Sequence, residues 1–205
     1  INMASQVTHI TYAKVVKEKF LTGKHIDEAK FYVGNIFPDI RYLGDITREE
    51  SHIKNPTVGS LLKIENSFEL GMYCHALIDR KREEALMKLG FYDVIAKDDL
   101  IPYAIKLIED QVNYPRTKNL PEVIGYLDSV FEEEVKLVPK DTVVKWHKLT
   151  SEYFSQSPTR QTIARFVEGL SIDKKIINSV LQLMDKVKEN KKAMRLIETT
   201  EENLF

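Results

Sequence analysis

Apolar residues recur three and four positions apart along most of this chain, which is the spacing of one face of an α-helix. The pattern predicts helices over 5–21, 25–37, 47–53, 60–89, 99–112, 121–136, 141–155, 159–169 and 173–199. Only 8 glycines and 7 prolines interrupt the chain, and the alternation typical of strands is nearly absent. We therefore expect an all-α, single-domain multi-helix bundle over residues 3–205. Ile1 and Asn2 precede Met3, and we expect them to lie outside the natural protein.

Composition narrows the class of protein. Hydrophobic residues make up 43% of the 205 residues and charged residues 30%, which is ordinary for a folded chain with a core. Thirty Lys and Arg against 31 Asp and Glu give no overall attraction to nucleic acid or anionic membranes. Cys74 is the single cysteine, no stretch approaches the roughly 20 apolar residues of a membrane span, and no secretory pattern opens the chain. We expect a cytoplasmic protein without a transmembrane segment.

The helix predicted over 60–89 has an irregular buried face. Placed at 100° per residue, this face carries Ile64, Phe68, Gly71, Met72, His75, Asp79, Arg82 and Leu86. His75 and Asp79 lie four apart in its middle and are stacked one turn over the other. An unpaired buried carboxylate costs several kcal/mol, so we expect a partner for Asp79. Two interpretations stay open: Asp79 forms a hydrogen-bonded pair with His75 or a salt bridge with Arg82, or His75 and Asp79 are two ligands of one metal ion. Gly71 leaves room for another helix or a ligand.

Two further residues supply candidate ligands. Asp39 follows Pro38 where the preceding helix is expected to break, and it is either an ordinary turn aspartate or a ligand held at a rigid exit. His52 lies in a short polar segment, where it is either a surface histidine or a ligand. Together with His75 and Asp79 they form a set of nitrogen and oxygen donors that suits Zn²⁺, Fe²⁺ or Mn²⁺.

The order of these elements resembles the zinc-dependent phospholipase C family, whose superfamily includes the fungal single-strand nucleases. The matching elements are His9, Gly34-Asn-Ile-Phe-Pro-Asp39, Ser51-His52-Ile-Lys-Asn-Pro56 and Gly71-Met-Tyr-Cys-His75-Ala-Leu-Ile-Asp79. The resemblance covers about residues 8–80. It implies an all-α bundle with a central metal site at Asp39, His52, His75 and Asp79. It also implies that His9 binds a second metal ion bridged by Asp79, although His9 lies on an apolar helix face and a core histidine is the alternative.

The chain departs from the family pattern after Asp79. The family places another metal-binding histidine soon after its aspartate, whereas this chain continues as Arg80-Lys-Arg-Glu-Glu-Ala85. The family also has a later histidine and glutamate four apart, but His147 is followed at that spacing by Ser151. We expect His147 to be a core residue. We therefore predict one or two bound ions, Zn²⁺ or else Fe or Mn, in place of three.

The resemblance implies a metal-dependent hydrolase of a phosphoester or phosphodiester, with a small molecule or a phospholipid head group as substrate. Asp39 and Asp79 would bind the metal ion that activates a water molecule, and a cationic side chain would replace the missing ion. Arg82 lies nearest to the ligand face, and Arg41 and Arg80 are the other candidates. The alternative function is a degenerate family member that keeps the bundle as a non-catalytic binding or interaction module. A third alternative is a metal-free bundle with chance matches. No nucleic-acid signal is specific, and no oligomeric state is predicted.

Overall fold

A computed structural model describes residues 5–170 and 172–205, so the expectations for Ile1, Asn2 and the first residues of the domain lie outside the described part. Over the described part, the chain is helical without a strand, which confirms the all-α prediction. The α-helices are α1 Gln6–Phe20, α2 Glu28–Ile36, α3 Arg48–Ser51, α4 Val58–Leu61, α5 Ser67–Lys88, α6 Ile101–Asn113, α7 Leu120–Tyr126, α8 Glu132–Val135, α9 Lys140–Phe154, α10 Arg160–Gly169, α11 Lys174–Glu189 and α12 Lys191–Glu198. The 3₁₀ helices are η1 Phe37–Leu43, η2 Phe91–Asp93, η3 Tyr114–Arg116 and η4 Glu201–Asn203.

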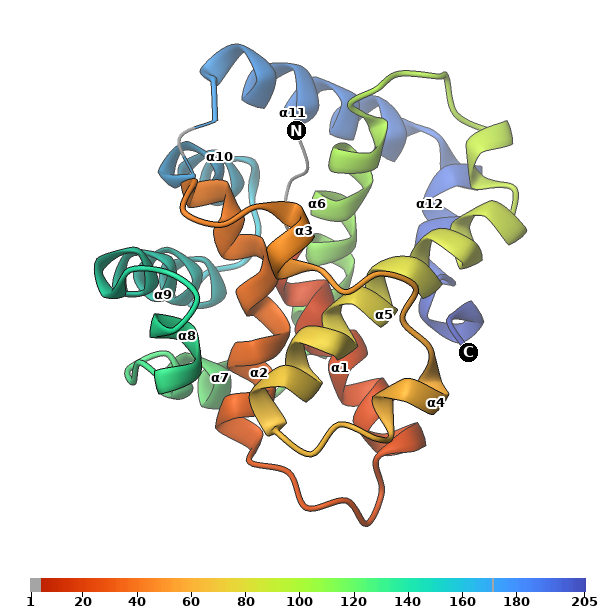
Figure 1. The fold of residues 1–205 in the computed structure, drawn as a ribbon. Helices are drawn as coiled ribbons and strands as arrows, with labels where there is room; N and C mark the ends of the chain where they lie inside the picture. Colours follow the sequence, from red (N-terminus) through yellow and green to blue (C-terminus); the bar gives the residue numbers. More distant parts are fainter. Residues whose placement is uncertain (1–4, 171) are drawn as a thin grey trace.

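Helices α1, α2, α5 and α6 form the centre of the fold (Figure 1). Helices α7 to α10 lie on one side of this centre, α11 crosses one end against α6, and α12 lies on the other side (Figure 1). Nearly all of the buried apolar side chains of the described residues belong to one connected core. None of the helices in the described ranges combines the length and the apolar character that crossing a bilayer needs.

Two glycines let α2 and α5 pack backbone against backbone. A Cβ atom on Gly71 would lie 2.2 Å from the carbonyl oxygen of Phe31, and one on Gly34 would lie 2.2 Å from the carbonyl oxygen of Phe68. Any larger residue would therefore push the two helices apart. The sequence left open whether Gly71 makes room for another helix or for a ligand. In the structure it makes room for helix α2.

The long helix predicted over 60–89 is wrong at its start. The chain forms the short helix α4 and then begins α5 at Ser67. The side chain of Asn66 accepts hydrogen bonds from the backbone N–H groups of Phe68 and Glu69, so it caps a new helix where a continuous one was expected. Ile64, expected on the helix face, lies in the turn before this cap.

Two other predicted helices are each divided in two. The segment 121–136 forms α7 and α8, with a turn between them. The segment 173–199 divides at Asn190, whose side chain accepts from the N–H groups of Lys192 and Ala193 and so begins α12. The helices predicted over 5–21, 99–112, 141–155 and 159–169 agree with the structure to within about two residues.

The exit of α2 differs from the expected break. The α-helix ends at Ile36, before Pro38 as predicted, but the chain continues directly as the 3₁₀ helix η1. Pro38 occupies the first turn of η1, where its missing N–H is tolerated. Asp39 is therefore fixed on a helical turn.

Candidate metal centre

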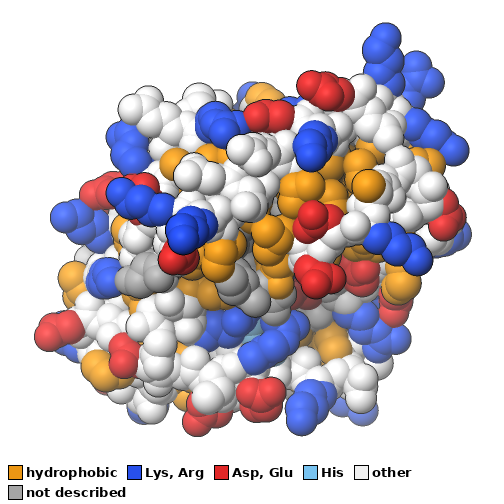
Figure 2. Space-filling view, turned by 90° about the horizontal axis from the view of Figure 1, so that it is seen from above, with side chains coloured by type: hydrophobic (Ala, Val, Ile, Leu, Met, Phe, Trp, Pro, Cys, Tyr) orange, Lys and Arg blue, Asp and Glu red, His pale blue; other side chains and the backbone are white. Residues whose placement is uncertain are grey.

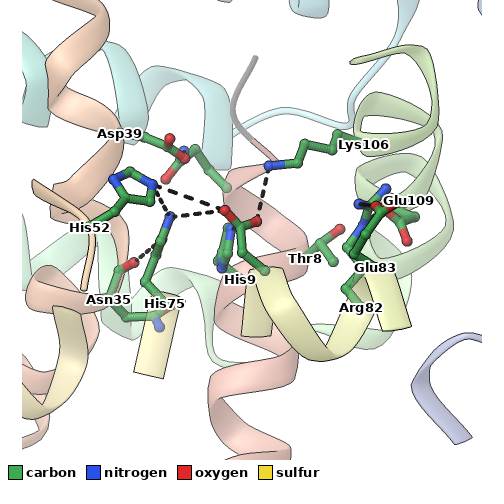
Figure 3. A network of polar contacts seen from close by, with 12 residues as sticks. Thr8, His9, Asn35, Asp39, His52, His75, Arg82, Glu83, Lys106 and Glu109 are labelled. Carbon is green, nitrogen blue, oxygen red and sulfur yellow. Dashed lines mark hydrogen bonds and ion pairs between the residues drawn. The ribbon is translucent and has the colours of Figure 1, made fainter. Parts of the chain in front are cut away.

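The five histidines and aspartates that the resemblance implied as ligands come together in the structure. His9 lies on α1, Asp39 on η1, His52 directly after α3, and His75 and Asp79 on α5. Donor atoms of His52, His75 and Asp79 lie within 4.8 Å of one another, and so do those of His9, Asp39 and His75. Figure 3 shows the labelled His9, Asp39, His52 and His75 side chains gathered at one place. We call these five residues the donor cluster.

Two imidazoles of the donor cluster face each other through Nε2. The Nε2 atoms of His52 and His75 are 3.2 Å apart. Nδ1 of His75 lies 2.8 Å from the carbonyl oxygen of Asn35, which only accepts, so this Nδ1 carries the hydrogen. Ser51 Oγ donates to the carbonyl oxygen of Thr47 and so accepts from Nδ1 of His52 at 2.9 Å. Both Nε2 atoms therefore carry lone pairs.

Burial keeps these imidazoles neutral. It lowers the pKa of His52 to about 4. Burial, together with the neighbouring His9, lowers the pKa of His75 well below its ordinary value. Near pH 7 neither ring takes up a second proton, so the two lone pairs face each other without a hydrogen between them.

The carboxylate of Asp79 is shared between two sets of neighbours. Its Oδ1 lies 3.0 Å from Nζ of Lys106 and 3.6 Å from Nε2 of His9. Its Oδ2 lies 3.8 Å from Nε2 of His75 and 4.0 Å from Nε2 of His52. Burial raises the pKa of Asp79, but Lys106 and His9 more than offset this, so the pKa lies well below the usual range. Asp79 is therefore ionised.

Asp39 is a second ionised carboxylate, buried beside His75. Its Oδ2 accepts a hydrogen bond from Nε2 of Gln6 at 2.8 Å, and Nη2 of Arg41 lies 3.9 Å from its Oδ1. Burial raises the pKa of Asp39, but the nearby His75 and Lys106 lower it by more than burial raises it. The pKa of Asp39 is therefore lowered overall.

His9 is buried but lacks a hydrogen-bond partner. Its ring stacks on that of His75 with centroids 3.9 Å apart and planes 12° apart. Among the described residues, neither ring nitrogen of His9 has a hydrogen-bond partner, although the residue is only 1% exposed. A buried imidazole normally finds at least one partner. Oδ1 of Asp79 lies 3.6 Å from Nε2 of His9, just beyond hydrogen-bond distance.

A pocket of about 380 Å³ reaches the donor cluster from the surface and includes His52 and Asp79 in its wall. Arg48, Arg80 and Lys106 also line it. Figure 2 shows a small pale-blue histidine surface between blue lysine and arginine side chains. The site is therefore reached through a basic opening.

Arg82 does not pair with Asp79. Its Nε donates to Oε2 of Glu109 at 2.5 Å, and both side chains are almost fully buried. The ion pair considered between Asp79 and Arg82 is therefore wrong, because the cation beside Asp79 is Lys106. Arg82 still lines the pocket, but its guanidinium is bound to Glu109.

The remaining candidates have separate contacts. His147 is a core residue as expected, since its Nδ1 lies 3.0 Å from the carbonyl oxygen of Leu127 and its Nε2 lies 2.7 Å from Oε1 of Glu134. Arg41 packs over the ring of Tyr42 beside Asp39.

Sequence reasoning missed Lys106 and Gln6. The sequence of α6 contains a signal for Lys106. In this otherwise apolar helix, polar residues follow helical spacing: Lys106, Glu109, Asp110 and Asn113. Glu109, Asp110 and Asn113 are buried, so this polar stripe faces the interior. Gln6 precedes His9 by one turn of α1, and no pattern distinguishes it from a surface glutamine.

Comparisons with models of protein families, with curated proteins and with solved structures found no significant match to this chain. The resemblance to the zinc-dependent phospholipase C family thus stays a prediction from the motifs.

Proposed function

We propose that this chain is a metal-dependent hydrolase of phosphoesters, related in fold to the zinc-dependent phospholipases C. The proposal rests on the two Nε2 lone pairs of His52 and His75, 3.2 Å apart with no proton between them. Lone pairs at this distance repel each other unless a cation is placed beside both of them.

The donor set fits a divalent transition metal. Three imidazoles and two carboxylates are borderline-to-hard ligands, which suit Zn²⁺ and also Fe²⁺ or Mn²⁺. Hydrogen bonds from neighbouring residues to the candidate ligands support this fit. His75 bonds to the carbonyl oxygen of Asn35, His52 to the hydroxyl of Ser51, and Asp39 to the amide of Gln6. Such partners fix the tautomer and the orientation of ligands in metal sites.

The surrounding residues favour a phosphorylated substrate. A bound divalent ion would lower the pKa of a water molecule and polarise a phosphoryl oxygen. Arg48 lines the pocket and would attract an anionic substrate toward the donor cluster. Arg80 also lines the pocket, but its Nε donates to Oε1 of Glu84 at 2.7 Å, so its charge is partly balanced. Arg82 has no role in this proposal because Glu109 already binds its guanidinium. Phosphodiesters, including phospholipid head groups, and phosphomonoesters are all candidate substrates.

The first experiment measures metal content and hydrolysis together. Protein purified without added metal is analysed for elements and then assayed with bis(p-nitrophenyl) phosphate and p-nitrophenyl phosphate. We expect bound Zn, Fe or Mn in the wild type, with hydrolysis lost in Asp79→Asn and metal lost in His75→Ala. His147→Gln is the matched buried control and His25→Ala the exposed one, because neither belongs to the donor cluster.

Each outcome selects one function. Absence of metal even after incubation with Zn²⁺, Fe²⁺ or Mn²⁺ contradicts the proposal and leaves a metal-free bundle. Bound metal without hydrolysis of either ester favours the non-catalytic module. Hydrolysis that survives in Asp79→Asn shows that the reaction takes place elsewhere.

A further inference from the structure

The two oxygens of Asp79 face different groups. Oδ2 faces the Nε2 atoms of His52 and His75, where the proposed ion would lie. Oδ1 faces Nε2 of His9 at 3.6 Å, and Nζ of Lys106 lies 3.0 Å from the same oxygen. A carboxylate that bridges two metal ions through both of its oxygens gives one oxygen to each. Here the oxygen on the His9 side already binds an ammonium group.

Lys106 reaches this position from a different helix. It lies on α6, and Figure 3 shows its side chain extended toward the donor cluster, with a dashed line marking its ion pair. The side chain is 13% exposed and lines the pocket, so it is accessible to a substrate but largely protected from water.

The charges of the site also disfavour a second ion. Lys106 and Arg41 lie beside Asp79 and Asp39 and balance the two carboxylates. One divalent ion would leave the site with two excess positive charges, which a hydroxide and an anionic substrate can offset. A second divalent ion would add two more charges within a few ångströms of an ammonium group, in a poorly solvated place.

We propose that the ammonium group of Lys106 takes the place of a second metal ion, so that the protein works with a single ion and a built-in organic cation. This inference rests on the proposed function. Lys106 excludes an ion from the position between Asp79 and His9. From the pocket wall, its Nζ donates a hydrogen bond to a phosphoryl oxygen of the substrate, where two-metal enzymes use their second ion.

The test counts bound ions in variants of Lys106. Metal-depleted protein is dialysed against Zn²⁺ and analysed for stoichiometry, and the Mn²⁺-loaded protein is examined by electron paramagnetic resonance. We expect one ion in the wild type and in Lys106→Arg, with the spectrum of an isolated Mn²⁺. We expect two ions in Lys106→Gln, with a spin-coupled Mn²⁺ spectrum, because the neutral amide releases the Asp79 oxygen.

A double variant locates the second ion. Lys106→Gln combined with His9→Phe keeps an aromatic ring against His75 but removes the unused nitrogens, so the stoichiometry should return to one. Lys145→Gln, an exposed lysine on α9, is the matched control and should bind one ion.

The outcomes separate this inference from the proposed function. One ion in the wild type and also in Lys106→Gln overturns the inference but not the proposed function. Two ions in the wild type have the same consequence, and that measurement does not depend on the folding of any variant. No ion in the wild type overturns the proposed function and this inference with it. Circular dichroism and thermal melting show whether each variant is folded.

Discussion

His75 and His147 are both buried histidines, and they differ in one contact. Each directs Nδ1 at a backbone carbonyl oxygen, that of Asn35 for His75 and that of Leu127 for His147. Nε2 of His147 meets the carboxylate of Glu134, which makes a complete hydrogen-bonded pair. Nε2 of His75 meets Nε2 of His52, a second lone pair. Burial is therefore shared by both regions, and the partner of Nε2 distinguishes a structural histidine from a candidate ligand.

The same contrast extends to the charged groups. Arg82 and Glu109 pair directly with each other, although Nη2 of Arg82 and Oε1 of Glu109 have no further partner among the described residues. In the donor cluster, neither ring nitrogen of His9 has a hydrogen-bond partner among these residues. A buried pair of opposite charges should lose stability when one partner is replaced. The donor cluster should instead respond to added metal.

The largest effect is expected from Arg82→Met. It leaves the Glu109 carboxylate buried without its partner, and breaking such a pair typically costs about 3–5 kcal/mol of unfolding free energy. The double variant Arg82→Met/Glu109→Leu should recover much of that loss. Urea denaturation measures both. A folded Arg82→Met protein that loses hydrolysis at unchanged stability would instead make Arg82 a catalytic residue.

Metal should stabilise the wild type but not a variant of the donor cluster. At a free metal concentration 100 times Kd, a ligand that binds only the folded state adds about 2.7 kcal/mol to the unfolding free energy. His75→Leu should show no such gain. Thermal melting of metal-depleted protein, with and without added Zn²⁺, measures the difference. An equal gain in both proteins would place the bound metal outside the donor cluster.

His147→Gln should destabilise the protein without affecting metal binding. Glutamine cannot reach both Leu127 and Glu134 as the imidazole does, and an incompletely partnered buried group costs about 1–3 kcal/mol. Denaturation and metal titration of the same preparation provide the two readouts. A reduced metal stoichiometry would remove the distinction drawn between the two histidines.

The last expected effect is a dependence of stability on pH and concerns Asp110. Burial raises the pKa of Asp110 to about 7 from an ordinary value of 3.8, despite hydrogen bonds from Thr8 and Tyr153. Between about pH 4 and pH 7 the folded state therefore binds a proton that the unfolded chain releases. The contribution of Asp110 to the unfolding free energy should decrease as the pH rises, by at most about 1.4 kcal/mol per pH unit, and become level above pH 7. The lowered pKa values of His52 and His75 act in the opposite direction, so the contribution of Asp110 is seen by comparison with a variant of that residue.

Asp110→Asn removes this titration, so the stability of the wild type relative to the variant should decrease as the pH rises to about 7. Urea denaturation of both proteins between pH 4.5 and pH 7.5 provides the comparison. Parallel curves would mean that the hydrogen bonds outweigh burial and keep Asp110 ionised.

The sequence predicts the helices well where periodicity alone decides them, as in α1, α6, α9 and α10. It fails at Asn66 and Asn190, since an asparagine is compatible with continuing a helix and also with capping the next one. Which of the two occurs depends on packing between helices, which no local pattern contains.

Most of the donor cluster was predictable because its members stand in recognisable short motifs. His75 and Asp79 share one helix face, and Asp39 follows a proline. The cation beside them was not predictable, since Lys106 comes from a helix that carries none of those motifs and reaches Asp79 only through the tertiary fold. Arg82, closer to Asp79 in sequence, pairs with Glu109 for the same reason.

The close approach of α2 and α5 has a consequence for redesign. Since Gly34 and Gly71 bring the two main chains into direct contact, the carbonyl oxygen that orients His75 is placed by backbone atoms. Surface side chains of either helix can therefore be exchanged with little effect on the imidazole. The pocket rim can therefore be redesigned with the position of His75 preserved, provided that both glycines are left untouched.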